Sequence, residues 1–475
     1  IFGEIDMNKL QRALENMLQR NEILRTGFEV EGDNAYQIVH EEAMPDVEIM
    51  DISDMDIESD EERYAHTMEG FVRPFDLDKP PLMRVRVVKC KLSTVLMIDV
   101  HHIIADGYTM NLLVKEFNAL YNGEELPEPM IQYCDYTEWM RNRDFDQDKR
   151  FWKERFANGV PKTELFIGKK MKSRRSYKGD SCTRRLYTGA RKDVIEFADR
   201  TNATEYMILL AVFSLVISRL SNQEDMVIGT PIACRTRPEL ENMIGMTLNT
   251  LPIKLRAEGN KTFREYLAGV RDYVLEVYDH QEYPLNDIAE TLGMDYQTGS
   301  SPFDILFILQ NNESEQLAFG NMPMRRVEMD DRKISKYDLV LSIRPVAYTF
   351  EVDFEYSTDI YADEDVNIIA EVFDTFLGRM MGQPDINTEL IEMASEQDLF
   401  VNIARFNETK ADVPNTKTVA DLFERMVYEN PDKLAVTTLT GELTYRELYA
   451  SAMSVALRLN KLGVGAGDMV MLKAK

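Results

Sequence analysis

The sequence predicts an α/β protein built from two halves of similar size, followed by the start of a further unit. Helical and strand-like patterns are mixed in irregular order up to about residue 395, which favours a sandwich-like α/β build over a regular βαβ repeat. A basic, weakly periodic stretch from Gly168 to Ser181 separates the halves. We therefore expect the halves at residues 1–165 and 166–395, a polar linker at 396–417 and a new unit at 418–475.

The first half is expected to begin with an amphipathic helix, because apolar residues recur at the i, i+3, i+4, i+7 and i+8 spacing. These residues are Leu10, Ala13, Leu14, Met17 and Leu18. Strands are predicted at residues 23–30, 82–92 and 94–102. A helix is predicted at 109–121 with Thr109 as its N-cap. One or two polar-faced helices should then follow, ending at Gly159.

The second half contains the most apolar stretch of the chain, Tyr206 to Leu220, which is shorter than the roughly 20 residues of a membrane span. We expect it to form a buried core helix. The other expected elements are strands at 181–189, 225–232, 248–257, 303–311 and 337–358, and helices at 191–200, 262–278 and 364–381. The last unit reads as helix, strand, hairpin, helix and strand, and it is too short for a compact α/β domain.

The overall composition is that of an ordinary globular protein, with 44% hydrophobic and 29% charged residues. The formal net charge of −27 makes nucleic acid and anionic membranes improbable partners. The four cysteines are widely spaced, which favours reduced thiols and a cytoplasmic protein over disulfides or a zinc site. The first residues do not read as a signal peptide, and the chain is expected to enter part-way along a fold.

The stretch "LMIDVHHIIADG" (Leu96 to Gly107) carries two adjacent histidines, His101 and His102. If the strand continues through them, their rings point to opposite faces, so they cannot both bind one metal ion. One imidazole is then free for proton chemistry near neutral pH. Asp106 could orient a ring or pair with an arginine. Gly107 could supply the backbone freedom of a tight turn before the helix.

Six motifs in a fixed order resemble those of condensation domains of nonribosomal peptide synthetases, within the chloramphenicol-acetyltransferase-like superfamily. "HHIIADG" matches HHxxxDG. "QRNEILRTGF" is similar to RHExLRTxF, with Asn21 in place of histidine. The region containing GxPxxGR has Cys234 in place of glycine. That region runs from Ile228 to Leu255, and the other three resemblances lie at Tyr133 to Arg141, Asp279 to Ile288 and Ser301 to Asn311.

The resemblance implies a fold of two chloramphenicol-acetyltransferase-like lobes that form a V around a central tunnel. It implies that His102 is catalytic and that His101 is structural. It also implies that Asp106 forms a salt bridge with Arg235. No metal ion is expected.

Other motif positions are given mainly structural roles. Arg20 and Arg25 are expected to maintain the fold. Asn249 and Asn311 are possible tunnel-lining residues, with a buried hydrogen-bonding role as the alternative.

The activity implied is peptide-bond formation between two acyl groups held as phosphopantetheine thioesters on carrier proteins. The partners implied are an upstream donor carrier, a downstream acceptor carrier and the chain's own adenylation domain. Residues 418–475 resemble the opening of such a domain, with an LTYxEL element at Leu443 to Leu448. The alternatives are an epimerisation domain, a coenzyme A-dependent acyltransferase and a non-catalytic platform that recruits carrier proteins.

Overall fold

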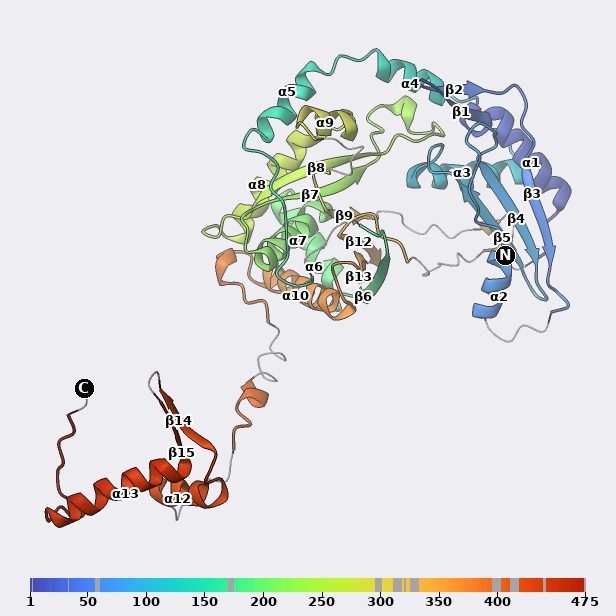
Figure 1. Cartoon of the computed structure of the whole chain (residues 1–475). Helices are drawn as coiled ribbons and strands as arrows, with labels where there is room; N and C mark the ends of the chain where they lie inside the picture. The colour runs from blue at the N-terminus through green and yellow to red at the C-terminus, as the bar shows by residue number, and fades with distance from the viewer. Residues whose placement is uncertain are drawn as a thin grey trace. The chain divides into compact units, whose positions relative to one another are not determined.

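The computed structural model describes most of the chain, namely residues 1, 3–32, 34–55, 60–169, 175–294, 301–310, 318–319, 322–324, 333–394, 403–410, 418–438 and 441–473. It divides into two compact units, Ile1–Ser395 and Glu396–Lys475 (Figure 1). The first unit holds two mixed α/β lobes, each with its own sheet and core. The predicted α/β class is therefore confirmed.

The first lobe is built on a three-stranded sheet of order β3-β4-β5, with bounds Asp46–Asp51, Met83–Lys89 and Thr94–Val100. β3 pairs with β4 in parallel, and β4 pairs with β5 antiparallel. Helices α1 (Met7–Arg20) and α3 (Gly107–Asn122) share one core with this sheet. A short helix η1 (Glu22–Arg25), a hairpin of β1 (Thr26–Glu31) and β2 (Asn34–Val39), and helix α2 (Asp60–Met68) complete the lobe.

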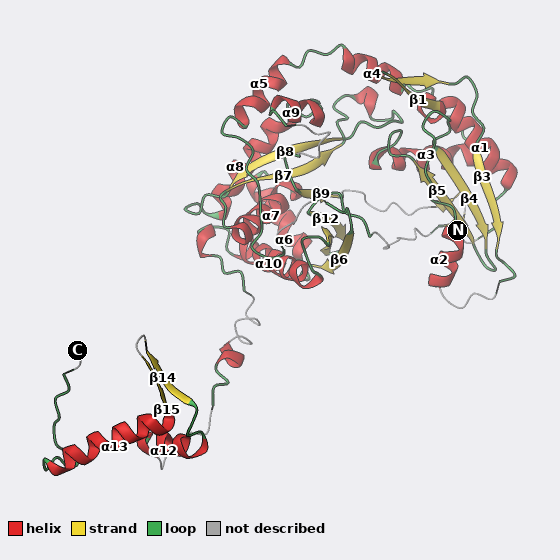
Figure 2. Cartoon of the chain, viewed as in Figure 1, coloured by secondary structure: helices red, strands yellow, loops and turns green. Residues whose placement is uncertain are grey.

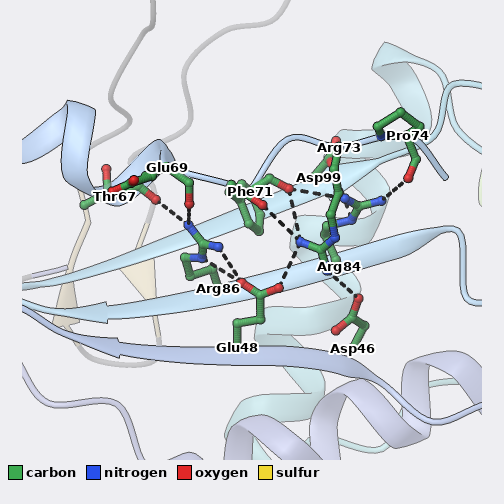
Figure 3. A network of polar contacts seen from close by, with 11 residues as sticks. Asp46, Glu48, Thr67, Glu69, Phe71, Arg73, Pro74, Arg84, Arg86 and Asp99 are labelled. Atoms are coloured by element: carbon green, nitrogen blue, oxygen red, sulfur yellow. Dashed lines mark hydrogen bonds and ion pairs between the residues drawn. The ribbon is translucent and has the colours of Figure 1, made fainter.

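The opposite face of β4 carries two buried arginines, Arg84 and Arg86 (Figure 3). Arg86 donates to the carbonyl groups of Thr67 and Glu69 at 2.9 and 2.8 Å, and Arg84 donates to that of Phe71 at 3.2 Å. These bonds hold residues 67–71 against the sheet, because buried carbonyl groups need donors.

The second lobe contains a six-stranded sheet of order β6-β13-β12-β9-β7-β8. Their bounds, in that order, are Gly179–Arg185, Thr349–Ser357, Leu339–Val346, Ile305–Leu309, Asp225–Ile232 and Asn249–Arg256. β9 pairs in parallel with β12 and β7, and the other neighbours are antiparallel.

Helices α6 (Ala190–Thr201), α7 (Glu205–Ser221), α8 (Phe263–Tyr278) and α10 (Asp363–Gly382) pack with this sheet around one core (Figure 2). The predicted core helix is confirmed, since most residues of α7 are buried. α9 (Leu285–Thr291) lies in the same lobe.

Two kinds of segment join the lobes. Helices α4 (Tyr133–Arg141) and α5 (Asp146–Arg155) connect them in sequence. The short strands β10 (Ala318–Phe319) and β11 (Met322–Pro323) lie between β9 and β12 in sequence, yet Phe319 packs in the first lobe's core, 4.4 Å from the ring of Tyr121. The second lobe's sequence therefore completes the first lobe's core.

The second unit contains α12 (Val419–Glu429), β14 (Leu434–Thr438), β15 (Gly441–Thr444) and α13 (Tyr445–Lys461). Its two strands form an antiparallel hairpin. The strand predicted after α13 is wrong, because residues 469–473 form no strand. Neither helix buries a residue, and Val455 and Leu457 are exposed.

Among the described residues no single helix has the length and apolar character to cross a membrane. One bent pair, α6 and α7, meets those two criteria together, with 105° between its helices.

The turn between β12 and β13 holds Ala347 in the left-handed region, at φ 48°. A Cβ is unfavourable there, and Ala347 is exposed, so its methyl group gains little from packing. Ala347→Gly should raise the free energy of unfolding by about 1 kcal/mol. Urea titration checks this. The control is Ala198→Gly within α6, which should lower the free energy of unfolding by about 1 kcal/mol. If both variants change this free energy in the same direction, the explanation is contradicted.

The basic stretch that separates the two predicted halves is partly built into the second lobe. Arg175 pairs with Asp304 at 3.1 Å and also with Asp338. Burial and the neighbouring Asp304 raise the pKa of Asp338 to about 6.

Because the folded chain holds the Asp338 proton more tightly than the unfolded chain, this group favours folding at low pH. That contribution is lost as the pH rises from about 4 through 6. Asp338→Asn should therefore increase the melting temperature more at about pH 8 than at about pH 5. Thermal unfolding of both proteins across this range tests the prediction, and a difference that stays constant with pH would contradict it.

Candidate functional site

The histidine pair lies just after β5, in the turn that leads to α3 (Figure 1). The strand ends at Val100, so the alternation of a regular strand does not extend to the two rings. The His101 ring is half-buried and meets Phe75 edge-on at 5.9 Å, and its Nδ1 accepts from the Ile103 N–H at 3.1 Å. The His101 ring is therefore held by packing and a backbone bond.

His102 is exposed and has a defined proton arrangement. Its Nδ1 lies 2.8 Å from the carbonyl oxygen of Ala105. A carbonyl oxygen only accepts, so Nδ1 carries the proton and Nε2 of the neutral ring has a free lone pair. This nitrogen can accept a proton from a reacting group.

Asp106 is buried and joins the two lobes. One carboxylate oxygen accepts from the backbone N–H of Thr109 at 2.7 Å, and the other from that of Thr247 at 3.0 Å. The prediction of Thr109 as N-cap is wrong: Asp106 caps α3, because its carboxylate accepts the bond that the helix leaves open. The nearest nitrogen of Arg235 is 4.0 Å from this carboxylate.

Arg235 is held mainly by neutral oxygen atoms. It donates to the Met243 carbonyl at 2.7 Å and to the Thr109 hydroxyl at 2.9 Å, and its guanidinium lies over the Tyr108 ring at 4.5 Å. Burial lowers the pKa of Arg235, and the nearby Asp106 carboxylate opposes this. The ion pair implied by the resemblance is thus long, and a shared threonine lies between its partners.

Gly107 is the first residue of α3, and its φ is not positive. A Cβ at this position would meet no atom within 4 Å. The backbone therefore does not require glycine, and the expected need for turn freedom is wrong.

The two motif arginines bind groups of the first lobe. Arg20 pairs with Glu116 at 3.2 Å, and Arg25 pairs with Glu22 at 3.7 Å and donates to the His40 carbonyl. Asn21, in place of the usual histidine, donates to Glu116 at 2.6 Å. Burial raises the pKa of Glu116, and the bonds from Asn21 and Arg20 oppose that effect.

Asn249 uses both ends of its amide on backbone groups. It donates to the carbonyls of Gln281 and Tyr283 at 2.8 Å, and it accepts from the N–H groups of Thr250 and Leu285 at 2.9 and 3.1 Å. Asn249 is half-buried, and these bonds match the hydrogen-bonding role that was the alternative to tunnel lining. Asn311 lies outside the described residues.

The sequence did not show two features of the site, the backbone conformation of Cys234 and the contact of Thr247. Cys234 has φ 50°, which explains why its motif usually carries glycine there, and burial raises the pKa of its thiol to about 12. Thr247 gave no signal, because it meets Asp106 mainly through its backbone N–H. Within the described ranges, no group of three or more His, Cys, Asp or Glu side chains is placed to hold a metal ion.

Comparisons with known proteins address the family. Residues 1–399 match the family model described as Condensation domain. The chain is 34% identical to bacitracin synthase 3 of Bacillus licheniformis, over 98% of its own length and 7% of that protein. It is 31% identical to surfactin synthase subunit 1 of Bacillus subtilis strain 168, over 98% of its length and 13% of that protein. The chain thus spans only a small part of these relatives.

Solved structures support the fold. A four-domain nonribosomal peptide synthetase bound to AMP and glycine matches with a TM-score of 0.76 at 19% identity, covering 97% of this chain and 36% of that one. The condensation domain of the monacolin K polyketide synthase matches with a TM-score of 0.71 at 22% identity, covering 81% of this chain and 91% of that one. These results confirm the two-lobed fold and the family predicted from the motifs. The chain belongs to the condensation domain family of nonribosomal peptide synthetases.

Proposed function

We propose that this chain forms a peptide bond between two acyl groups carried as phosphopantetheine thioesters. The acceptor's α-amine attacks the thioester carbonyl of the donor, a C–N bond forms, and the C–S bond breaks to free the donor thiol. The observation that carries this proposal is the exposed His102 ring with its proton on Nδ1 and a free lone pair on Nε2.

The protein needs to add little activation to the donor carbonyl, because a thioester is already reactive. His102 Nε2 takes the proton that the attacking amine loses, and the protonated ring then gives it to the departing thiolate. Placement of the two substrates supplies the rest of the rate gain. In this scheme Asp106 holds the turn that carries His102 and stays outside the proton path.

Membership of the family supports carrier proteins as the partners. An upstream and a downstream carrier protein bring the phosphopantetheine arms to the tunnel between the lobes, and no metal ion takes part. Residues 418–475 form the first part of an adenylation domain, and the exposed apolar residues of α13 suit a helix that a larger domain covers. We place the reaction in the cytoplasm, in the synthesis of an antibiotic or siderophore peptide.

The test is a direct condensation assay. The two carriers are loaded with aminoacyl-phosphopantetheine and mixed with the protein, and intact-protein mass spectrometry detects any dipeptide on the downstream carrier. Several amino acid pairs are used, so that one unsuitable substrate does not decide the result. Dipeptide from wild type but not from His102→Ala supports the proposal.

Three other results would each favour one of the alternative functions. Binding of both carriers without dipeptide from any pair would favour the recruiting platform. Inversion of the donor's α-carbon without bond formation would favour epimerisation. Transfer from an acyl-coenzyme A donor alone would favour the free-standing acyltransferase.

A further inference from the structure

The hydroxyl of Thr109 lies where the two lobes meet and is wholly buried. It donates to the carbonyl oxygen of Gly245 at 2.5 Å and accepts from Arg235 at 2.9 Å and from the Gly245 N–H at 3.3 Å. One donated and two accepted bonds satisfy this group fully. The direct polar contact of Arg235 with the first lobe is thus made through Thr109, since the Asp106 carboxylate is 4.0 Å away.

The segment that Thr109 meets, residues 243–249, is fixed at further points. The Tyr133 hydroxyl donates to the Met246 carbonyl at 2.8 Å, and the Thr247 N–H donates to Asp106. A Cβ on Gly245 would overlap the Tyr133 ring, so the backbone approaches this ring closely. The first turn of α3 is therefore held against the second lobe over several contacts.

The start of α3 also carries the group that holds the orientation of the His102 ring. Asp106 caps α3 through the Thr109 N–H, and its carbonyl oxygen accepts from the Met110 N–H at 2.9 Å. The peptide that precedes Asp106 carries the Ala105 carbonyl, which accepts a hydrogen bond from the Nδ1–H of His102. A shift of the α3 start moves this carbonyl and changes which ring nitrogen holds the proton.

We propose that Thr109 is a positioning residue for His102: its hydroxyl bonds to Gly245 and Arg235 fix the start of α3, and with it the ring orientation and tautomer of His102. This proposal rests on the condensation reaction proposed above. Thr109 is fully buried and cannot touch a carrier protein, so it acts on turnover and not on carrier binding.

The experiment compares Thr109→Val, which removes the hydroxyl at nearly equal volume, with Thr109→Ser, which keeps it. In the loaded-carrier assay Thr109→Val should lower kcat by about 10²-fold, the scale of a misplaced catalytic group, with the KM for the acceptor carrier unchanged. Thr109→Ser should recover most of the rate. Thr109→Cys, with a weaker donor, should fall between them and serves if Thr109→Val does not fold.

The matched control is Thr230→Val in β7. Thr230 is buried, and its hydroxyl donates to the Phe307 carbonyl at 3.0 Å and accepts from Tyr206 at 2.9 Å, all within the second lobe. The Thr230→Val substitution removes a similar buried hydroxyl at a position away from α3. The kcat of the folded variant should therefore stay near the wild-type value.

A second readout does not depend on activity. Long-range 1H–15N spectra of histidine-labelled protein report which nitrogen of His102 holds the proton, and His102→Gln identifies its signals among the five histidines. The Nδ1-protonated signature should be present in wild type and Thr109→Ser and reduced in Thr109→Val. An unchanged kcat in Thr109→Val, or a reduced kcat with an unchanged His102 signature, would overturn the proposal. If wild type makes no dipeptide, the proposed function fails, while the spectra still decide whether Thr109 sets the ring.

Discussion

His102→Ala should lower the condensation rate by about 10²- to 10⁴-fold, the range that a positioned general base contributes. The ring is exposed, and its one described bond is to the Ala105 carbonyl, so the melting temperature should hardly change. The measurement is initial dipeptide formation with both carriers at saturating concentration. A rate within tenfold of wild type would remove His102 from the centre of the mechanism.

His102→Gln separates two roles of the same residue. The glutamine amide oxygen can accept a hydrogen bond from the attacking amine, but it cannot take its proton at neutral pH. If His102 is a proton acceptor, His102→Gln should be as slow as His102→Ala. A glutamine variant that is much faster than the alanine variant would show that holding the amine is the main contribution.

Asp106→Ala should have the largest effect on stability. It leaves Arg235 without its nearest carboxylate and takes the acceptor from two backbone N–H groups, those of Thr109 and Thr247. Leaving two buried N–H groups without their acceptor costs about 1–3 kcal/mol each. The melting temperature should therefore fall on the order of 10 °C. Asp106→Asn should cost less, because asparagine also caps helices.

The comparison for this variant is Asp385→Ala. Asp385 pairs with Arg264 at 2.8 Å, but this pair lies at the surface. Exposed pairs contribute little, so its melting temperature should stay close to wild type. If both alanine variants unfold at the same temperature, Asp106 contributes no more to stability than the exposed Asp385.

Much of the fold was predictable because it depends on local pattern. The spacing of apolar residues gave α1, and all five of the predicted residues are buried. The apolar run at α7 and the strand at β7 were also placed correctly. Periodicity and burial act over a few residues, so a single sequence carries them.

The contacts that shape the site were harder to predict from the sequence. Asp106 and Thr109 both suit an N-cap, and the choice depends on the second lobe, which supplies the Thr247 N–H to Asp106 and takes the Thr109 hydroxyl. The end of β5 at Val100 coincides with a bond from the His101 N–H to the Leu82 carbonyl, which spacing alone does not show. Contacts made by backbone groups far apart in the chain leave no residue signature.

The core position of Phe319 affects how the chain can be made in the cell. A ribosome releases the first lobe's helices and strands long before it releases this ring, which packs against Phe117 and Tyr121. The same delay applies to Thr247, which completes the cap of α3. A nascent chain that stops after the first lobe therefore exposes an unfinished core. The order of synthesis makes the turn that carries His102 one of the last parts of this lobe to reach its final form.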